Sequence, residues 1–318
     1  MKLIPIVALA GLLVAPTGAR AACKLPSVDV PVVMEGLRPM VSAKVAGRPV
    51  KLLVDSGAFF SGLNRQFAEE NKLKSPAYMP TGSHLHADVD LTTSGAAGVE
   101  HQTVIVTATM ELGGSNYHQI DFVTHPLVLG GAAGLLGQNF LHGADADYDF
   151  KAGRIRFLRP TDCAQTDLAY WVKSGESYSV LPLETNDSRV NQHTRVTVEI
   201  NGVKMRAYFD TGAPNSFITA RAASRAGVKT TDPEVKAAGV GHGTDGDLKM
   251  WIGPFASIKI GDEEVKNTQL AIGDSKAEAF DVLIGADFFM AHHVLVANSQ
   301  GKIYFSYLGG PIFKRPAD

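Results

Sequence analysis

The sequence has few charged residues, and its positive and negative charges nearly balance. Charged residues make up 19% of the 318 residues, and the formal net charge is −2. A basic patch that would bind nucleic acid or an anionic membrane is therefore not expected. A P-loop, a dinucleotide-binding glycine pattern and a Ser-His-Asp order do not stand out either. The hydrophobic content of 45% is enough for one large domain or two modest ones with proper cores.

Long apolar runs are scarce, and the run at the N-terminus is too short to span a bilayer comfortably. It extends from Leu3 to Val14, follows Lys2, and precedes the sequence Ala19-Arg20-Ala21. This pattern predicts a secretory signal over residues 1–21, with cleavage before Ala22. We therefore expect an exported protein, periplasmic or secreted, with no stable membrane insertion once the signal is removed.

Cysteine is nearly absent, because the chain has only Cys23 and Cys163. An even count in an exported protein favours a disulfide between them, and two unrelated thiols are the alternative. A lipoprotein would need Cys23 at the cleavage point, but Arg20 stands three positions earlier, where such signals usually place an apolar residue. A bridge would tie the mature N-terminus to the segment that joins two repeated halves of the chain.

The two halves become visible when Asp55 is aligned with Asp210. In each copy, alternating apolar residues lead to a turn glycine, Gly47 or Gly202, and then to a second apolar strand that ends at the aspartate. A repeat of this kind changes the whole fold prediction, because each copy becomes one structural unit.

The copies also agree after the aspartate. Asn64 and Thr219 are plausible N-caps for short helices predicted over residues 65–72 and 220–227. Each copy then carries an apolar-apolar-glycine segment, ending at Gly137 or Gly285, and finishes on a strand. These final strands are predicted over residues 154–158 and 302–307.

We predict lobe one over residues 26–158, a linker over 159–176 and lobe two over 177–310. The linker is expected to have one helical turn around residues 167–172. Both lobes are strand-rich with little helix beyond the pieces named, so the expected fold class is all-β.

Each aspartate opens a motif that can hold a carboxylate at a tight turn. The two copies are Asp55-Ser56-Gly57-Ala58 and Asp210-Thr211-Gly212-Ala213. The glycine permits the turn, and neighbouring backbone and hydroxyl groups can hold the carboxylate. A single copy would be read as an ordinary Asx turn. Two copies at equivalent positions, each followed by an apolar-apolar-glycine segment, are a far more specific signal.

With these motifs the sequence resembles the retropepsin-like aspartic proteases, in particular bacterial members with two such lobes in one chain. The resemblance implies two pseudo-twofold-related β-barrel lobes, with Asp55 and Asp210 facing one another and sharing a water. It also implies that Ser56 and Thr211 lock the two loops together through hydroxyl hydrogen bonds.

The resemblance further implies an aspartic endopeptidase that acts on a peptide or protein substrate. Two close carboxylates cannot both ionise cheaply, so one would activate the water while its protonated partner stabilises the developing oxyanion. The segments with Gly137 and Gly285 would support the loops from behind. No metal or organic cofactor is required, and one chain suffices, so a monomer is expected. A catalytically silent peptide- or protein-binding module on the same fold is the alternative.

Alanine follows both motif glycines, at Ala58 and Ala213, where digestive relatives of the wider fold tend to carry a hydroxyl residue. One donor fewer to the charged dyad should raise its apparent pKa values. We therefore expect a working range at mildly acidic or neutral pH.

The family closes its active site with a flap hairpin. In lobe two the candidate is Ala237–Phe255, where Gly241 belongs to a mobile tip and Trp251 could cover a bound side chain. In lobe one the candidate lies within Thr81–Val104. Its possible turn residues are Gly95 and Gly98.

Other histidines and aspartates are interpreted as structural. A zinc site could be imagined at His84, His86 and Asp88, but a polar strand or loop face is the simpler interpretation. Calcium could be imagined where acidic residues alternate before a strand. Without an EF-hand loop we expect these residues to form the solvated side of a strand: Asp145, Asp147 and Asp149. The adjacent pair His292 and His293 is also expected to be structural.

Overall fold

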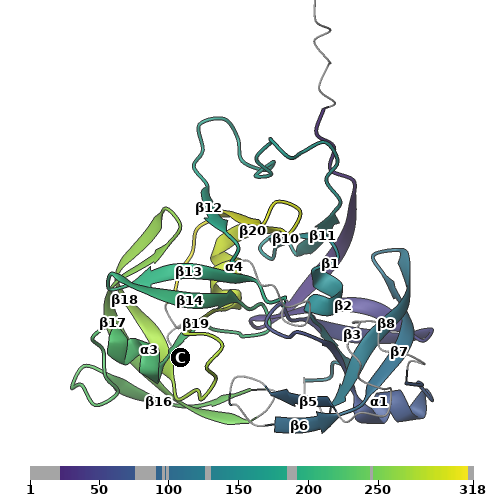
Figure 1. Cartoon of the computed structure of the whole chain (residues 1–318), viewed down its shortest axis with the longest axis horizontal. Coiled ribbons are helices and arrows are strands. Elements are labelled where there is room, and N and C mark those ends of the chain that lie inside the picture. Colours follow the sequence, from purple (N-terminus) through teal and green to yellow (C-terminus); the bar gives the residue numbers. More distant parts are fainter. Residues whose placement is uncertain are drawn as a thin grey trace, which may run out of the picture.

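The computed structural model describes residues 22–75, 91–94, 97, 100–125, 130–184, 192–243 and 246–313. Within them the chain forms two lobes made mostly of β-strands, joined by a sheet to which both contribute (Figure 1). The predicted all-β, two-lobed fold class is confirmed. The predicted signal, residues 1–21, lies outside the described residues.

The two lobes have corresponding elements, except that the long strand β17 of lobe two stands where lobe one has β6 and β7. Lobe one contains β2 (Arg38–Val45), β3 (Arg48–Val54), β4 (Ser61–Asn64), α1 (Arg65–Glu70), β5 (Leu91–Ser94), β6 (Glu100–Thr103), β7 (Ile105–Leu112), β8 (Ser115–His125), β9 (Gly134–Leu136) and α2 (Gln138–Leu141). Lobe two contains β13 (Arg195–Ile200), β14 (Val203–Phe209), β15 (Phe217–Thr219), α3 (Ala220–Arg225), β16 (Lys236–His242), β17 (Asp247–Ile260), β18 (Glu263–Gly273), β19 (Val282–Ile284) and α4 (Ala286–Ala291).

The strand registers confirm the internal duplication. In lobe one, β3 pairs in parallel with β9, and Leu53 lies opposite Leu135. In lobe two, β14 pairs in parallel with β19, and Tyr208 lies opposite Leu283. The first strand of each pair ends one residue before the aligned aspartate, so the duplicated fold delivers both aspartates to equivalent positions.

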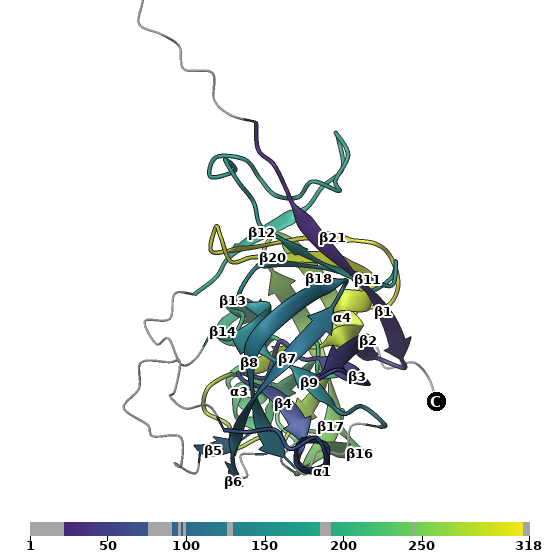
Figure 2. The same ribbon diagram turned by 90° about the vertical axis from the view of Figure 1, so that its right-hand side faces the viewer.

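The shared sheet has the order β12-β21-β20-β10-β11-β1. Its strands are β1 (Ser27–Glu35), β10 (Asp145–Asp149), β11 (Arg154–Leu158), β12 (Ser179–Pro182), β20 (His292–Ala297) and β21 (Lys302–Tyr307). The lobes meet where β10 pairs with β20, with Tyr148 opposite Val294. Figure 2 shows β1 running down from this sheet toward β2, with which its second half pairs. The predicted last strands of the two copies are confirmed as β11 and β21.

Short helices follow the predicted caps. The Asn64 side chain accepts a hydrogen bond from the Gln66 N–H, and Thr219 accepts one from the Ala222 N–H. Helices α1 and α3 end two residues earlier than predicted, because Lys72 and Gly227 have left-handed backbone with φ of 52° and 82°.

Two further helices, α2 and α4, were not expected from the sequence. Each begins directly after the glycine of an apolar-apolar-glycine segment, Gly137 or Gly285. A β-carbon at either glycine would overlap backbone atoms of the loop that follows the aspartate motif. Glycine is therefore required there because the helix start lies against the loop that follows the aspartate motif.

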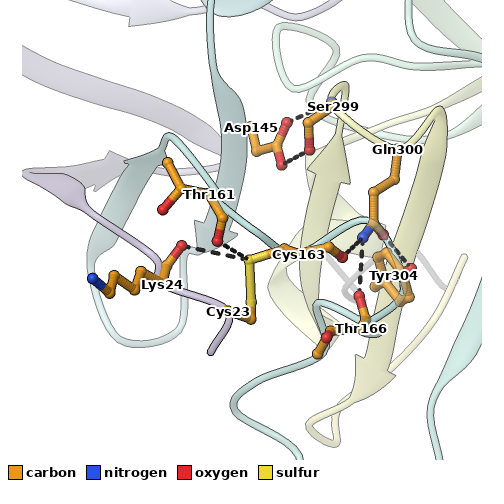
Figure 3. The surroundings of a disulfide bond; sticks show 9 residues. All are labelled: Cys23, Lys24, Asp145, Thr161, Cys163, Thr166, Ser299, Gln300 and Tyr304. Carbon is orange, nitrogen blue, oxygen red and sulfur yellow. Dashed lines mark hydrogen bonds between the residues drawn. A yellow bond between two sulfur atoms is a disulfide. The ribbon is translucent and has the colours of Figure 1, made fainter. Parts of the chain in front are cut away.

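The predicted disulfide between Cys23 and Cys163 is confirmed (Figure 3). Lys24 forms a β-bridge with Thr161 beside it, so the N-terminal segment is held to the linker by backbone bonds as well. The helical turn predicted around residues 167–172 is not formed; in its place residues 169–172 make a hydrogen-bonded turn, closed by the Val172 N–H and the Ala169 carbonyl.

The three aspartates of β10 are buried, so the prediction that they form the solvated side of a strand is wrong. Asp145, Asp147 and Asp149 are 2%, 1% and 7% exposed. The reason is the position of β10, which lies inside the shared sheet between β11 and β20 and has both faces covered.

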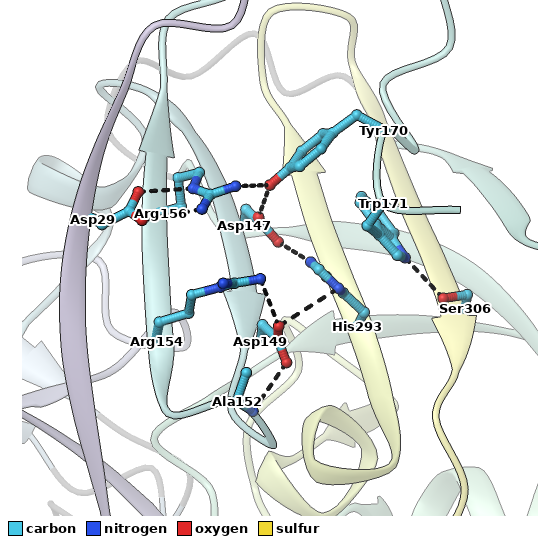
Figure 4. A network of polar contacts seen from close by, with 10 residues as sticks. All are labelled: Asp29, Asp147, Asp149, Ala152, Arg154, Arg156, Tyr170, Trp171, His293 and Ser306. Atoms are coloured by element: carbon cyan, nitrogen blue, oxygen red, sulfur yellow. Dashed lines mark hydrogen bonds and ion pairs between the residues drawn. The ribbon is translucent and has the colours of Figure 1, made fainter. Parts of the chain in front are cut away.

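Buried carboxylates need donors, and distant segments supply them (Figure 4). The Tyr170 hydroxyl and the His293 Nε2 atom both bond to Asp147. His293 also stacks on Trp171 with ring centroids 4.0 Å apart, and its Nδ1 atom lies 3.9 Å from Asp149. The prediction that His293 is structural agrees with this position in the shared sheet. No helix of the described residues is long and apolar enough to cross a membrane.

Candidate active site

The two aspartate motifs form matching turns at the centre of the molecule. The Asp55 Oδ1 atom accepts hydrogen bonds from the N–H groups of Gly57 and Ala58, at 3.1 and 2.9 Å. The Asp210 Oδ1 atom accepts from Gly212 and Ala213, at 2.9 and 3.1 Å. Each carboxylate is thus held by its own turn, as the motif predicted.

The motif glycines show how close the two carboxyls come to the opposite turn. A β-carbon on Gly57 would overlap the Asp210 carboxyl, and a β-carbon on Gly212 would overlap the Asp55 carboxyl. Each acid therefore lies over the glycine of the other lobe. Any larger residue at either glycine would push the two carboxyls apart.

Crossed hydrogen bonds lock the two turns together. The Thr211 hydroxyl accepts from the Ser56 N–H at 3.0 Å and donates to the Val54 carbonyl at 2.7 Å. The Ser56 hydroxyl accepts from the Thr211 N–H at 3.0 Å and donates to the Phe209 carbonyl at 2.7 Å. Both hydroxyls are buried and have a donor and an acceptor from the other lobe, so the dyad is held rigidly across the lobe interface.

Burial raises the pKa of both carboxyls, and that of Asp55 well above its ordinary value. The charge of Asp210 raises the pKa of Asp55 further, while backbone N–H groups of each turn oppose these increases. Burial of two adjacent acids therefore favours retention of one proton by the pair. The effect of the alanines at 58 and 213 on pH dependence stays a prediction.

The apolar-glycine segments lie behind the turns and support them. The Asp55 N–H donates to the Leu136 carbonyl at 2.9 Å, and the Asp210 N–H donates to the Ile284 carbonyl at 2.8 Å. Gly137 and Gly285 each donate a backbone hydrogen bond to a buried serine hydroxyl of their own lobe. The contacts are those expected of loop support at Gly137 and Gly285.

Gln138 is a residue that the motifs did not point to. Its side-chain amide is buried and donates to the Ser56 carbonyl at 2.8 Å and to the Thr194 hydroxyl at 3.0 Å. It thereby joins the lobe-one turn to lobe two. The aligned position in lobe two is Ala286. This difference between two otherwise similar segments could have drawn attention to Gln138 in the sequence.

The hairpin β16–β17 contains the region predicted as the lobe-two flap. Gly241 lies near its tip, whereas Trp251 packs against the hydrophobic core. A pocket of about 450 Å³ lies between this hairpin and the loop after the second motif, and its lining includes Gly241, Met250 and Asn215. Trp251 is not among the residues that line it.

The lobe-one hairpin β5–β6 falls within the predicted region Thr81–Val104. Its turn residues Gly95 and Gly98 lie outside the described residues, but Ala97 between them packs against apolar side chains of lobe two. The hairpin therefore reaches across to the opposite lobe. The set His84, His86 and Asp88 also lies outside the described residues.

His193 lies beside the site and was not predicted. Its ring stacks on Tyr208 with centroids 4.7 Å apart and meets Phe59 edge-on. Burial, helped by the charge of Arg195, lowers the pKa of His193 to about 4, so the ring is neutral at mildly acidic pH. Within the part of the chain that the structure describes, no grouping of histidine, cysteine and acidic side chains could hold a metal ion.

Comparisons with known proteins agree with this geometry. The family model described as aspartyl protease matches residues 41–140 and 196–288, one segment in each lobe. The fold is similar to the crystal structure of an aspartic proteinase from Irpex lacteus, with a TM-score of 0.52, 13% sequence identity, and 89% of this chain and 97% of that chain covered. At this identity the likeness shows the fold alone. The comparison with curated proteins finds no similar sequence. The family match covers more than half of the chain, and the chain therefore belongs to the aspartyl protease family.

Proposed function

We propose that the protein is an aspartic endopeptidase whose catalytic residues are Asp55 and Asp210. The observation that carries this proposal is the position of each carboxyl over the glycine of the opposite turn. Two buried acids held this close cannot both ionise cheaply, so the pair retains one proton and can act as acid and base at once.

The proposed reaction uses the two acids in different roles. The charged partner accepts a proton from a water held between the carboxyls as the water attacks the peptide carbonyl. The protonated partner donates a hydrogen bond to the carbonyl oxygen and stabilises its developing charge. The crossed serine and threonine hydroxyls keep the two acids in this geometry, so little reorganisation is needed during the reaction.

The substrate we propose is an extended peptide lying between the lobes, covered by the hairpins β5–β6 and β16–β17. Backbone pairing with the hairpins would hold the peptide, and pockets such as the one beside Met250 would receive side chains. We also propose that the chain acts as a monomer, after export to the periplasm or the exterior. The disulfide is compatible with an oxidising compartment. The division into 26–158, 159–176 and 177–310 is kept as the proposed domain organisation.

A peptide library with the parent protein and the variants Asp55→Asn and Asp210→Asn tests the proposal. Cleavage between pH 3 and 8 by the parent, and its loss in both variants with folding intact, is the expected result. Activity that survives in either variant would contradict the shared dyad. A parent that binds peptides but cleaves none would support the alternative, a binding module on the same fold.

A further inference from the structure

The pocket of about 450 Å³ beside the lobe-two hairpin contains a buried acid. The pocket lies next to the second aspartate turn, because its lining includes Asn215 and Ser216, which follow the motif that begins at Asp210. Asp287, the second residue of α4, also lines it and is 9% exposed. Asp287 has no part in the proposed reaction, so the dyad does not account for an acid at this place.

The hydrogen bonds of Asp287 use one of its two carboxylate oxygens. Oδ1 accepts from the N–H and the hydroxyl of Ser216, at 2.9 and 2.7 Å, and from the Phe288 N–H at 2.9 Å. Oδ2 accepts no hydrogen bond from the described residues, and it is not among their side-chain atoms that are both sealed from solvent and unbonded. Oδ2 therefore keeps access to solvent, and the pocket that Asp287 lines is the space that provides it.

The matched position in lobe one shows that support of the turn does not require an acid. The counterpart is Asn139, whose Oδ1 atom accepts from the Ser61 N–H and hydroxyl at 2.7 and 2.8 Å. Its second polar atom, Nδ2, donates to the Asp121 carbonyl at 2.8 Å. A neutral amide thus makes the same bonds to its serine and leaves no polar atom unbonded. The charge and the unbonded oxygen of Asp287 are not needed to hold Ser216.

Asp287 also lacks a cationic partner. Within the described residues it forms no ion pair, unlike Asp281 of the same lobe, which pairs with Arg225 at 2.7 Å. Burial raises the pKa of Asp287, and the hydrogen bonds from Ser216 and Phe288 oppose this increase. A buried carboxylate is costly unless it is paired, so a cation entering the pocket would stabilise its ionised form.

The remaining lining of the pocket suits a long side chain with an apolar stem. Met250, Ile252 and Ala271 contribute apolar surface, and the amide of Gln269 contributes polar surface. Lysine and arginine bury their methylene stems along apolar surface while their charged ends stay in polar surroundings. The charged end of such a side chain can form a strong, charge-assisted hydrogen bond with a carboxylate like that of Asp287.

We propose that the lobe-two pocket binds a lysine or arginine side chain of the substrate, and that Asp287 is the specificity-determining residue. The apolar walls hold the stem, and the unbonded oxygen of Asp287 accepts from the charged end. This inference rests on the proposed function for the nature of the ligand, an extended peptide between the lobes. Lobe one has the neutral Asn139 at the matched position, so the preference for a basic residue belongs to one side of the site.

Binding of paired peptides tests the role of the charge. Peptides with a non-cleavable hydroxyethylene bond carry either lysine or norleucine, whose side chain is apolar and of similar length, at each position in turn on both sides of that bond. Their affinities for the full chain are measured by calorimetry at neutral pH. At one position the lysine peptide should bind roughly tenfold or more tightly than the norleucine peptide, because a pocket that excludes water strengthens the ion pair.

Asp287→Asn copies lobe one and should remove this preference. Asparagine keeps the oxygen that accepts from Ser216, as Asn139 does in lobe one, so the fold should be preserved. The lysine peptide should lose its advantage, while the norleucine peptide keeps its affinity. The matched control is Asp274→Asn, which removes an exposed acid of the same lobe that does not line the pocket and should leave the preference in place.

A second variant covers the case in which Asp287→Asn does not fold. Gln269→Lys places a cation at an exposed position of the pocket lining, where a charged side chain does not disturb the core. This resident cation competes for Asp287, so the lysine preference should fall here too. A preference equal to that of the parent would contradict the inference.

The outcomes separate this inference from the proposed function. Equal affinity of lysine and norleucine peptides at every position, or a lysine preference that survives in folded Asp287→Asn, overturns the pocket inference even if the parent cleaves peptides. A lysine preference that depends on Asp287, without any cleavage by the parent, supports the pocket and overturns the peptidase. Failure of all the peptides to bind overturns both.

Discussion

The two lobes share a polar scaffold but differ in the side chains around it. In lobe one Ser61 donates its hydroxyl hydrogen bond to Asn139 at 2.8 Å, and in lobe two Ser216 donates to Asp287 at 2.7 Å. Both serine hydroxyls also accept the N–H of the segment glycine, at 3.0 and 2.8 Å. The bonds that place the aspartates are thus duplicated, whereas Gln138, which bridges the lobes, has Ala286 as its counterpart. The duplicated frame therefore tolerates different side chains around it.

The largest expected effect concerns the dyad, where the lobes should be equivalent. Asp55→Asn and Asp210→Asn should each lower kcat/KM by about 10²–10⁴ or more, because each removes one of the two proton-transfer groups. Asparagine keeps the oxygen that accepts from the turn N–H groups, so both variants should fold. Cleavage rates and thermal melts of the two proteins measure this directly. A variant that retains parental activity would show that only one lobe supplies chemistry.

The second-largest expected effect concerns the shared sheet, where lobe one supplies acidic side chains and lobe two supplies a histidine. Strand β10 of lobe one supplies buried carboxylates, and β20 of lobe two supplies His293, which is 3% exposed. His293→Ala should cost about 3–5 kcal/mol of unfolding free energy, because it removes a buried partner of Asp147.

Chemical denaturation measures this cost. An exposed pair of a histidine and an aspartate provides the control. His242 bonds Asp247 at 2.7 Å, but their side chains are 76% and 68% exposed. His242→Ala should therefore change stability by about 1 kcal/mol or less. Similar costs for the two variants would refute the view that the buried network holds the lobes together.

Much of this architecture was predictable because the chain repeats itself. Local patterns predicted both aspartate turns and both capped helices, since the motif, the cap and the turn glycine are neighbours in sequence. Helices α2 and α4 were missed because four or six residues are too few to show helical periodicity.

Long-range partners could not be predicted. The aspartates of β10 resemble an exposed strand edge in sequence, and only the fold brings Ser299, Tyr170 and His293 to them. The ring contacts among Tyr208, Phe217 and Phe280 in lobe two were hidden for the same reason, because the three residues come from separate segments.

A smaller loss of stability is expected when the residue after Gly137 is replaced by its lobe-two counterpart. Gln138→Ala introduces the residue found at Ala286 and leaves the Ser56 carbonyl and the Thr194 hydroxyl without their amide donor. A cost of about 1–3 kcal/mol is expected, because both groups are buried. Denaturant unfolding measures it. Gln66→Ala, which removes an exposed amide that bonds Glu70, should change stability by about 0.5 kcal/mol or less. Equal effects of the two substitutions would argue against a bridging role for Gln138.

The smallest expected effect concerns the pH dependence of stability, where the buried aspartates of the two lobes should behave alike and an aspartate paired with an arginine should behave oppositely. A carboxyl whose pKa rises on folding binds its proton more tightly in the native state, so its contribution to stability is full below the unfolded pKa and is lost as pH rises through the folded value. Asparagine does not titrate. Asp55→Asn should therefore melt above the parent at neutral pH, with a gap that closes toward acidic pH.

Asp210→Asn should show the same trend, because burial also raises the pKa of Asp210. Asp29→Asn is the control of opposite sign, since the hydrogen bond from Arg156 lowers the pKa of Asp29 and its stabilisation is lost as pH falls. Thermal melts of the three variants from pH 3 to 8 separate these cases. If Asp55→Asn melts below the parent at neutral pH, with a gap that persists in acid, burial does not destabilise the ionised form of Asp55 and the expected pKa increase is contradicted.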